Sequence, residues 1–186
     1  MGHDKNKVHL MQGTLEEWKK LGGKVENTST KIISSSDLDT SKTSTYQATD
    51  AKNIVDMNDI LSIAKGGTDN NIIVDARANA RFNGTAPEPR PVLHAGHIPK
   101  SLNIPFTNLL VDPNEGITLK PKSELESELK DIINSDKNIV CSCGSGVTAC
   151  YIALALDECE QNDENIFLYD GSWAEYGDDP DVPIET

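Results

Sequence analysis

One stretch in the last third of the chain constrains the fold more than any other. Residues 138–142, NIVCS, contain a β-branched apolar run, residues 143–147, CGSGV, are punctuated by glycine, and residues 148–156, TACYIALAL, are rich in alanine and leucine. This order predicts a strand, a tight turn and the start of a helix. The first peptide N–H groups of a helix lack intrahelical partners and carry the positive end of its dipole, so they point at the turn. We therefore expect an anion site at the bend, where Cys143 lies.

Cys143 is our candidate nucleophile. Gly144 and Gly146 allow the backbone to curl so that successive N–H groups face inward and form a nest for an anion. A thiolate is such an anion, and in this setting the pKa of a thiol falls from about 8.5 into a range of roughly 3.5 to 7.5. Because the thiolate is the nucleophilic form, the turn predicts a reactive cysteine.

Strands and helices alternate through the chain from residue 46. Buried strands are predicted near 72–76 and 166–169. Helices are predicted after a cap at Asp56 or Asn58, over 148–159, and from a capping box formed by Ser123 and Glu126. The buried stripe of this last helix is expected to be Leu125, Leu129, Ile132 and Ile133. The alternating order implies an α/β fold, a mostly parallel sheet with helices on both faces.

Composition limits the number of domains and the class of partner. A chain of 186 residues holds one substantial α/β domain and a fragment. Thirty acidic against 17 basic residues give a net charge of -13, which repels nucleic acid and anionic membrane surfaces. Since no run of 18 apolar residues exists and the start carries no targeting pattern, we expect a soluble protein with neither direct nucleic-acid nor membrane partners.

The four cysteines lie close together in the sequence, at positions 141, 143, 150 and 159. Their spacing lacks the C-x2-C knuckle of common zinc sites, and cysteines two apart in a strand are poorly placed to form a disulfide. We therefore predict no metal, and expect Cys141, Cys150 and Cys159 to be small buried hydrophobic residues in a reducing compartment.

The N-terminal segment repeats a pattern found near the C-terminus. Residues 8–26 predict a strand, a glycine turn and an amphipathic helix with Trp18, and residues 166–176 combine a strand, Gly171 and Trp173 in a loosely similar way. Two such copies suggest the last βα units of two related domains, although an ordinary N-terminal decoration is the alternative. The polar residues 27–45 between them predict an exposed linker.

A Pro- and Gly-broken segment with several arginines follows the predicted strand 72–76. Open α/β folds bind ligands at the carboxyl ends of their parallel strands, so this segment is expected near the site. Arg77 is expected to pair with a local carboxylate. On composition alone, Arg81 and Arg90 would be solvated surface residues.

Two motifs carry a family resemblance. Cys143–Ala149, CGSGVTA, closely resembles the active-site loop of rhodanese-like sulfurtransferases of the 3-mercaptopyruvate type. His94–Pro105 resembles the G-H-I-P-G-A motif of the same fold, with Lys100 in place of a glycine. Related phosphatases have an arginine where this chain has Ala149, and thiosulfate-preferring relatives have basic residues where it has Gly144 and Ser145. The resemblance covers residues 46–177 well and 8–26 weakly.

The resemblance implies a fold and a domain organisation. Residues 46–186 would form a catalytic rhodanese-like domain of three layers, and residues 27–45 the polar linker. Residues 1–26 would be the C-terminal remnant of a first rhodanese-like domain. His97 would be structural, packing the turn before a strand.

The resemblance also assigns site residues. Arg81 and Arg90 match the positions that bind the substrate carboxylate, which suits the bidentate fork of a guanidinium. Ser145 resembles a serine thought to handle a proton. Backbone N–H groups after Cys143 would stabilise the thiolate and a persulfide. The predicted site is therefore Cys143 and Ser145 as catalytic residues, with Arg81, Arg90, Gly144, Gly146, Val147 and Thr148 binding substrate. For Thr148, capping of the following helix is the other role left open.

The implied function is sulfur transfer without a cofactor. Cys143 would take sulfur from 3-mercaptopyruvate, and less well from thiosulfate, release pyruvate and hold a persulfide. A thiol acceptor such as thioredoxin, or a sulfur-carrier pathway protein, would then remove the sulfur. The alternative is a persulfide-relay protein that supplies a partner in tRNA thiolation with little small-molecule turnover. A non-catalytic interaction domain is disfavoured by the intact Cys143 loop. The expected location is the cytoplasm, with mitochondria left open.

Overall fold

A computed structural model of the chain describes residues 3–11, 13–28, 49, 52–67, 70–113 and 118–186. It divides into two units, residues 1–52 and 53–186, and each is a separate body here. From residue 29 onward, the predicted linker 27–45 lies outside the described residues. Among the residues described, no helix is long and apolar enough to cross a membrane.

The first unit contains the 3-10 helix η1 (Lys5–Lys7) and the helix α1 (Leu15–Lys20). Thr14 caps α1 through a capping box with Glu17, after a turn in which Gly13 has a φ of 113°. The helix predicted after Gly13 is thereby confirmed. The strand predicted before Gly13 is wrong for residues 8–11, which lie in no strand and are exposed. A strand needs neighbours to satisfy its backbone, and these residues pair with none in the part described.

The second unit is built on a five-stranded parallel sheet of order β1-β5-β4-β2-β3. The strands are β1 (Ile54–Val55), β2 (Asn71–Asp75), β3 (Leu102–Asn103), β4 (Asn138–Ser142) and β5 (Ile166–Tyr169). The helices are α2 (Met57–Ala64), α3 (Asn79–Phe82), η4 (Phe106–Leu109), α4 (Lys122–Glu128), α5 (Ala149–Glu158), η5 (Asp163–Asn165) and α6 (Ser172–Tyr176).

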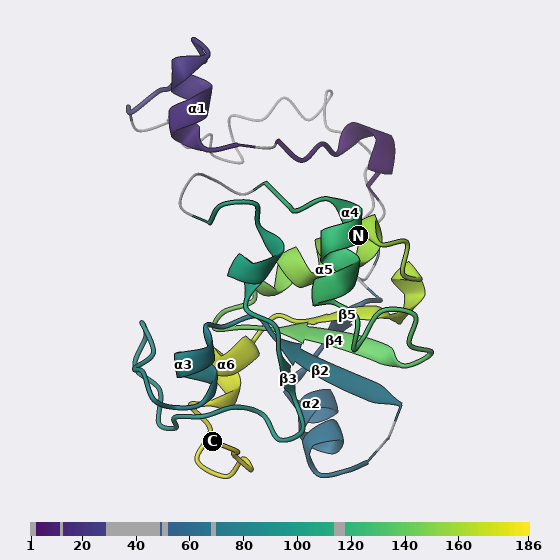
Figure 1. Ribbon diagram of the computed structural model, residues 1–186. Coiled ribbons are helices and arrows are strands. Elements are labelled where there is room, and N and C mark those ends of the chain that lie inside the picture. Colours follow the sequence, from purple (N-terminus) through teal and green to yellow (C-terminus); the bar gives the residue numbers. More distant parts are fainter. Residues whose placement is uncertain (1–2, 12, 29–48, 50–51, 68–69, 114–117) are drawn as a thin grey trace, which may run out of the picture. The chain divides into compact units, whose positions relative to one another are not determined.

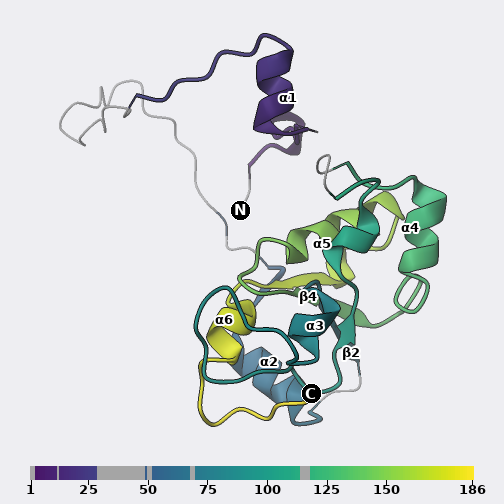
Figure 2. The ribbon, with the colours of Figure 1, turned by 60° about the vertical axis from the view of Figure 1, so that its left-hand side comes forward.

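Helices cover both faces of the sheet (Figures 1 and 2). Helices α4 and α5 lie on one face, and α2 and α6 lie on the other. On the first face Val74 and Cys141 pack with Leu125 of α4 and Ile152 of α5. A second cluster on the other face joins Ile60, Ile73, Val140, Trp173 and Tyr176. The predicted three-layer α/β fold with a parallel sheet is confirmed.

Local signals placed most helix boundaries in the second unit. Asp56 caps α2 in a capping box with Asp59, as predicted. The capping box predicted at Ser123 is wrong, because α4 begins at Lys122 after Pro121 and has no side-chain cap. The φ of Pro121, -56°, already suits a helix start. The four predicted stripe residues do pack in the core, with Leu125, Leu129 and Ile132 buried and Ile133 packed against them. The helix is shorter than predicted, however, since α4 ends at Glu128 and the last three of these residues lie in the turns that follow.

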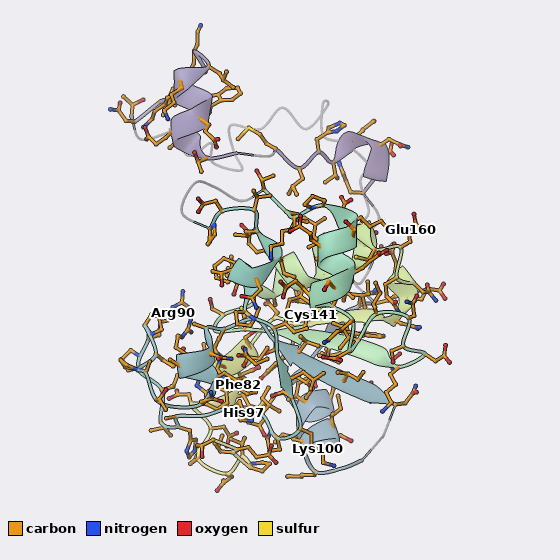
Figure 3. All side chains as sticks on the ribbon, viewed as in Figure 1. Phe82, Arg90, His97, Lys100, Cys141 and Glu160 are labelled. Atoms are coloured by element: carbon orange, nitrogen blue, oxygen red, sulfur yellow. The ribbon has the colours of Figure 1, made fainter. Side chains whose placement is uncertain are left out.

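His97 has a structural place, as predicted. Its buried ring stacks on Phe82 with the ring centroids 3.7 Å apart, and its Nδ1 lies 2.9 Å from the Phe82 carbonyl oxygen. Figure 3 marks both residues in the lower part of this unit. Lys100 keeps the left-handed conformation that the usual glycine would take, with a φ of 65°.

The sheet register brings two chain segments to one edge. Asp75, the last residue of β2, is paired with Ser142, the last residue of β4. Since parallel strands end at the same edge, Arg77 and Cys143 both emerge there.

Candidate active site

Cys143 lies at the base of a cavity of about 160 Å³ at this edge of the sheet. Its side chain is only 1% exposed. Seven of the eight predicted site residues line the cavity: Arg81, Arg90, Cys143, Gly144, Ser145, Val147 and Thr148. The structure therefore gathers two segments, 81–92 and 143–148, as expected from their positions after two predicted parallel strands, whereas the substrate-binding roles of Arg81 and Arg90 came only from the resemblance.

The turn stabilises the anionic form of Cys143. Burial by itself raises the pKa of the Cys143 thiol. Hydrogen bonds from the Thr148 side chain and from the backbone N–H groups of Ser145, Ala149 and Thr148 outweigh that effect, so the pKa is lowered. The Ser145 nitrogen lies 3.5 Å from Sγ. The predicted anion nest is thus present in the geometry.

Thr148 lines the cavity but does not cap the helix. It occupies the N-cap position of α5, but its side chain makes no capping hydrogen bond. Its hydroxyl instead acts on Cys143, where hydrogen bonding by Thr148 is one of the causes that lower the pKa of the thiol. Thr148 therefore supports the thiolate directly.

Ser172 holds the backbone of the Cys143 loop in place through hydrogen bonds. Its Oγ accepts hydrogen bonds from the Cys143 and Gly146 backbone N–H groups, 3.0 Å each, and donates to the Tyr169 carbonyl oxygen at 2.9 Å. Ser172 is fully buried and has a φ of 51°, a conformation that costs a non-glycine residue energy and is kept only where neighbours enforce it. Sequence reasoning missed Ser172. The Gly171-Ser172-Trp173 stretch was a signal, but only of a domain end.

Gly146 is the one predicted site residue outside the cavity lining. Its N–H group is used by Ser172, and its φ is 81°. A Cβ at this position would lie 2.8 Å from both the backbone oxygen and Oδ1 of Asp170. The role that the structure gives Gly146 is therefore conformational.

Arg77 is a buried structural cation, as predicted. Its Nε donates to Asp75 Oδ2 at 2.9 Å, its Nη1 to Glu88 Oε1 at 2.7 Å, and its Nη2 to the Gly96 carbonyl oxygen at 2.8 Å. The guanidinium also lies over the ring of Trp173, 4.4 Å from its centroid.

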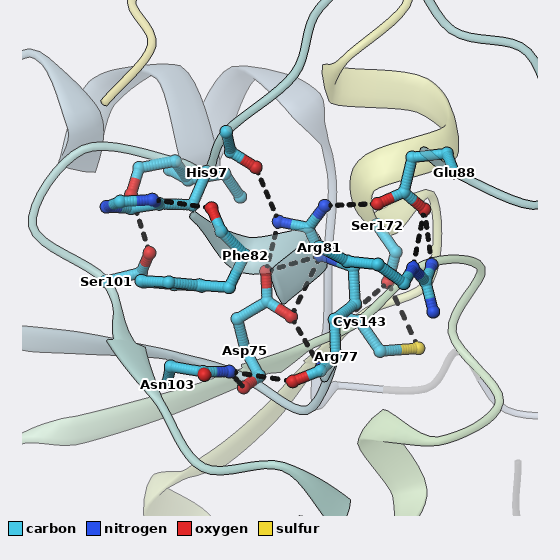
Figure 4. Close-up of polar contacts among 12 residues, drawn as sticks. Asp75, Arg77, Arg81, Phe82, Glu88, His97, Ser101, Asn103, Cys143 and Ser172 are labelled. Carbon is cyan, nitrogen blue, oxygen red and sulfur yellow. Dashed lines mark hydrogen bonds and ion pairs between the residues drawn. The ribbon is translucent and has the colours of Figure 1, made fainter. Parts of the chain in front are cut away.

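Arg81 and Arg90 both reach the cavity, but from different environments. Arg81, in α3, has a side chain 26% exposed and forms an ion pair with Glu88 (Figure 4). A Cβ at Gly144 would lie 2.6 Å from Arg81 Nη2, so the guanidinium is directly beside the Cys143 loop. Arg90 is exposed and forms no ion pair within the described ranges. Glu88, which sequence reasoning also missed, lines the cavity with them.

The other three cysteines differ chemically from Cys143. Burial raises the pKa of Cys141 to about 12, and the pKa values of Cys150 and Cys159 are raised as well, chiefly because part of each thiol is removed from water. Cys141 and Cys159 are buried as predicted, but Cys150 is exposed, which corrects that prediction. Ala149 points into the core, and residue 150 therefore lies about 100° further round α5, toward the surface. Of the four cysteines, Cys143 alone has a lowered pKa.

Comparisons with known proteins agree with this geometry. The family model described as "Rhodanese-like domain" matches residues 45–179. The chain is 46% identical over 114 residues to thiosulfate/3-mercaptopyruvate sulfurtransferase 1, mitochondrial, of Arabidopsis thaliana, covering 61% of this chain and 29% of that protein. Thiosulfate/3-mercaptopyruvate sulfurtransferase 2 of Arabidopsis thaliana is 36% identical over 195 residues, covering 98% and 55%.

A solved structure shares the fold. The yeast mitochondrial complex I sub-stoichiometric sulfur transferase subunit superposes with a TM-score of 0.60 at 33% identity, covering 72% of this chain and 44% of that one. The chain thus spans about half or less of the length of these relatives.

Proposed function

The chain belongs to the rhodanese-like domain family, and we propose that it is the catalytic part of a sulfurtransferase that moves sulfur from 3-mercaptopyruvate through a Cys143 persulfide to a thiol acceptor. One observation carries the proposal. The only cysteine with a lowered pKa lies in one cavity with two arginines that suit a carboxylate.

The proposed reaction has two half-reactions. The Cys143 thiolate attacks the sulfur of 3-mercaptopyruvate, forming an S–S bond while the C–S bond breaks. The electron pair leaves with the enolate of pyruvate, which takes a proton, and Cys143 is left as a persulfide. An acceptor thiolate then attacks the outer sulfur, the Cys143 S–S bond breaks, and Cys143 returns as thiolate.

Three of the predicted side chains and the backbone of the Cys143 loop have tasks in this scheme. Arg81 and Arg90 would hold the substrate carboxylate, and Ser145 at the cavity wall would handle the proton. The N–H groups of Ser145, Thr148 and Ala149 that face the thiolate would also stabilise the persulfide anion. No step requires a metal or a cofactor.

The proposal extends to the domain organisation and location. We propose that residues 1–26 are the end of a first rhodanese-like domain. This is supported by a relative about twice as long as this chain, because 98% of the chain aligns with 55% of that relative. We propose a cytoplasmic or mitochondrial location, since one relative is named mitochondrial.

A second function, persulfide relay to a protein partner, is favoured by one comparison. A structural neighbour is a sulfur transferase that is a subunit of complex I in yeast mitochondria. The relay would use the same Cys143 persulfide, but its acceptor would be a protein and its turnover of small thiols would be slow.

The deciding experiment is intact-mass spectrometry after treatment with 3-mercaptopyruvate. The proposal expects the gain of one sulfur atom, mapped to Cys143, and its loss on addition of reduced thioredoxin. Absence of any sulfur gain would overturn both functions. A stable persulfide that thioredoxin does not remove would favour the relay.

A further inference from the structure

The carboxylate of Glu88 bridges two arginines, the buried Arg77 and the cavity residue Arg81. Its Oε1 accepts a hydrogen bond from Arg77 Nη1 at 2.7 Å, and its Oε2 accepts from Arg81 Nε at 3.1 Å and also from Arg81 Nη2 (Figure 4). Its side chain is only 10% exposed, yet it is part of the wall of the Cys143 cavity. A carboxylate is therefore built into a site whose proposed ligand is an anion.

The negative charge of Glu88 is not needed to neutralise Arg77. Arg77 already has its own carboxylate, because Asp75 lies 2.8 Å from Nη2 and 2.9 Å from Nε. The negative charge of Glu88 therefore neutralises the positive charge of Arg81. Of the two arginines at the cavity, only Arg90 then has no carboxylate partner within the described part of the chain.

We propose that Glu88 is a specificity-determining residue that makes the cavity favour singly charged sulfur donors over doubly charged ones. Arg81, Arg90 and Glu88 together give the wall one net positive charge, which one substrate carboxylate matches. A doubly charged donor would bring excess negative charge next to the Cys143 thiolate. Glu88 also occupies the Nε–Nη2 edge of Arg81, an edge that could otherwise bind a second anionic group side-on. This inference rests on the proposed function for the identity of the donor.

The first test measures the charge of the cavity without any sulfur chemistry. Cys143 in the full chain is alkylated with iodoacetate, an anion, and with iodoacetamide, its neutral analogue, and the two rate constants are divided. The ratio cancels the thiolate fraction, which both reactions require. Glu88→Gln should raise the ratio at least about tenfold, because at an effective dielectric constant of about 20 a unit charge changes the energy of an anion by about 1.4 kcal/mol even at about 12 Å.

Two variants separate charge from packing. Glu88→Asp keeps the charge while disturbing the geometry, and its ratio should stay within about twofold of the wild type. Glu185→Gln removes a carboxylate outside the cavity, near His97, and should leave the ratio unchanged. An unchanged ratio in Glu88→Gln, or an equal rise in Glu88→Asp, would overturn the proposal.

A double variant covers the case in which Glu88→Gln does not fold. Arg81→Gln with Glu88→Gln removes both members of the ion pair, and it should show a ratio about tenfold above that of Arg81→Gln alone. Equal ratios in these two proteins would also overturn the proposal.

The second test uses the donors themselves. In Glu88→Gln, persulfide formation from thiosulfate, a dianion, should gain about tenfold relative to formation from 3-mercaptopyruvate. If neither donor loads Cys143 in the wild type, the proposed function fails, while the alkylation ratio still decides the role of Glu88. If both donors load and their relative rates are equal in wild type and variant, the specificity role is refuted.

Discussion

Replacing Ser172 with alanine should destabilise the second unit by about 2 to 6 kcal/mol. The hydroxyl is the acceptor for two buried donors, the Cys143 and Gly146 N–H groups, at 3.0 Å each. A buried donor left without a partner costs about 1 to 3 kcal/mol. Alanine fits the same space, so little is added by a cavity, and the φ of 51° is as unfavourable for alanine as for serine.

Chemical denaturation of the full chain measures this loss. Ser123→Ala, at an exposed position in α4, is the matched control and should change the unfolding free energy by no more than about 0.5 kcal/mol. Hydrogen exchange provides a local readout, since the Cys143 and Gly146 amides should lose protection in Ser172→Ala. A loss below about 1 kcal/mol with intact protection would refute the reasoning. The Trp173 and Ala174 N–H groups, which donate to the Cys143 and Gly144 carbonyl oxygens at 2.9 Å, would then be sufficient to hold the loop.

Three further predictions concern reactivity. Cys143→Ser should abolish persulfide formation in intact-mass spectra, because a hydroxyl is not appreciably ionised near neutral pH, whereas Cys150→Ala should leave persulfide formation intact. Sulfur found on any other cysteine would show that Cys143 is not the nucleophile. Arg81→Ala should raise the KM for 3-mercaptopyruvate about ten- to a hundredfold, and Arg90→Ala should raise it less because Arg90 is exposed. Unchanged steady-state kinetics in both variants would show that the two arginines do not bind the substrate carboxylate. Thr148→Val should raise the pKa of Cys143, since a hydrogen bond to the thiolate is lost, and the pH profile of iodoacetamide alkylation should move to higher pH with an unchanged plateau rate. Thr148→Ser should keep the wild-type profile. Coincident profiles for the wild type and both variants would contradict the hydrogen bond.

The parts of the fold that the sequence predicted are those with local causes. The strand predicted at 138–142 has those bounds in the structure, and the helix predicted at 148–159 runs from Ala149 to Glu158. A β-branched run, a glycine turn and an alanine-rich segment act over a few residues each. Similarly, Asp56 was readable as a cap because its partners are the N–H groups of Asn58 and Asp59.

The parts that were missed depend on distant partners. A strand before Gly13 needs neighbouring strands, which no local pattern can supply. Cys150 was expected in the core because cysteine usually is, but its position on α5 is set by how that helix lies on the sheet. Ser172 reaches Cys143 across 29 positions of sequence, so its role appears only when β5 and α6 are in place. Of the site, Cys143 and its nest of backbone N–H groups were predicted from local residues, and the side-chain support from Ser172 was not.

Gly144 links two features that look unrelated in the sequence, namely the lack of a side chain after Cys143 and the position of Arg81. The sequence gives a neutral residue after Cys143 and, far away, an arginine expected to bind a carboxylate. In the structure Arg81 Nη2 lies where a side chain at 144 would begin, 2.6 Å from the ideal Cβ. Any larger residue at 144 would have to displace the guanidinium, which Glu88 holds in place. The absence of a side chain at 144 is therefore the condition for Arg81 to lie beside Cys143, and a basic residue could be introduced there only by moving the arginine that it would imitate.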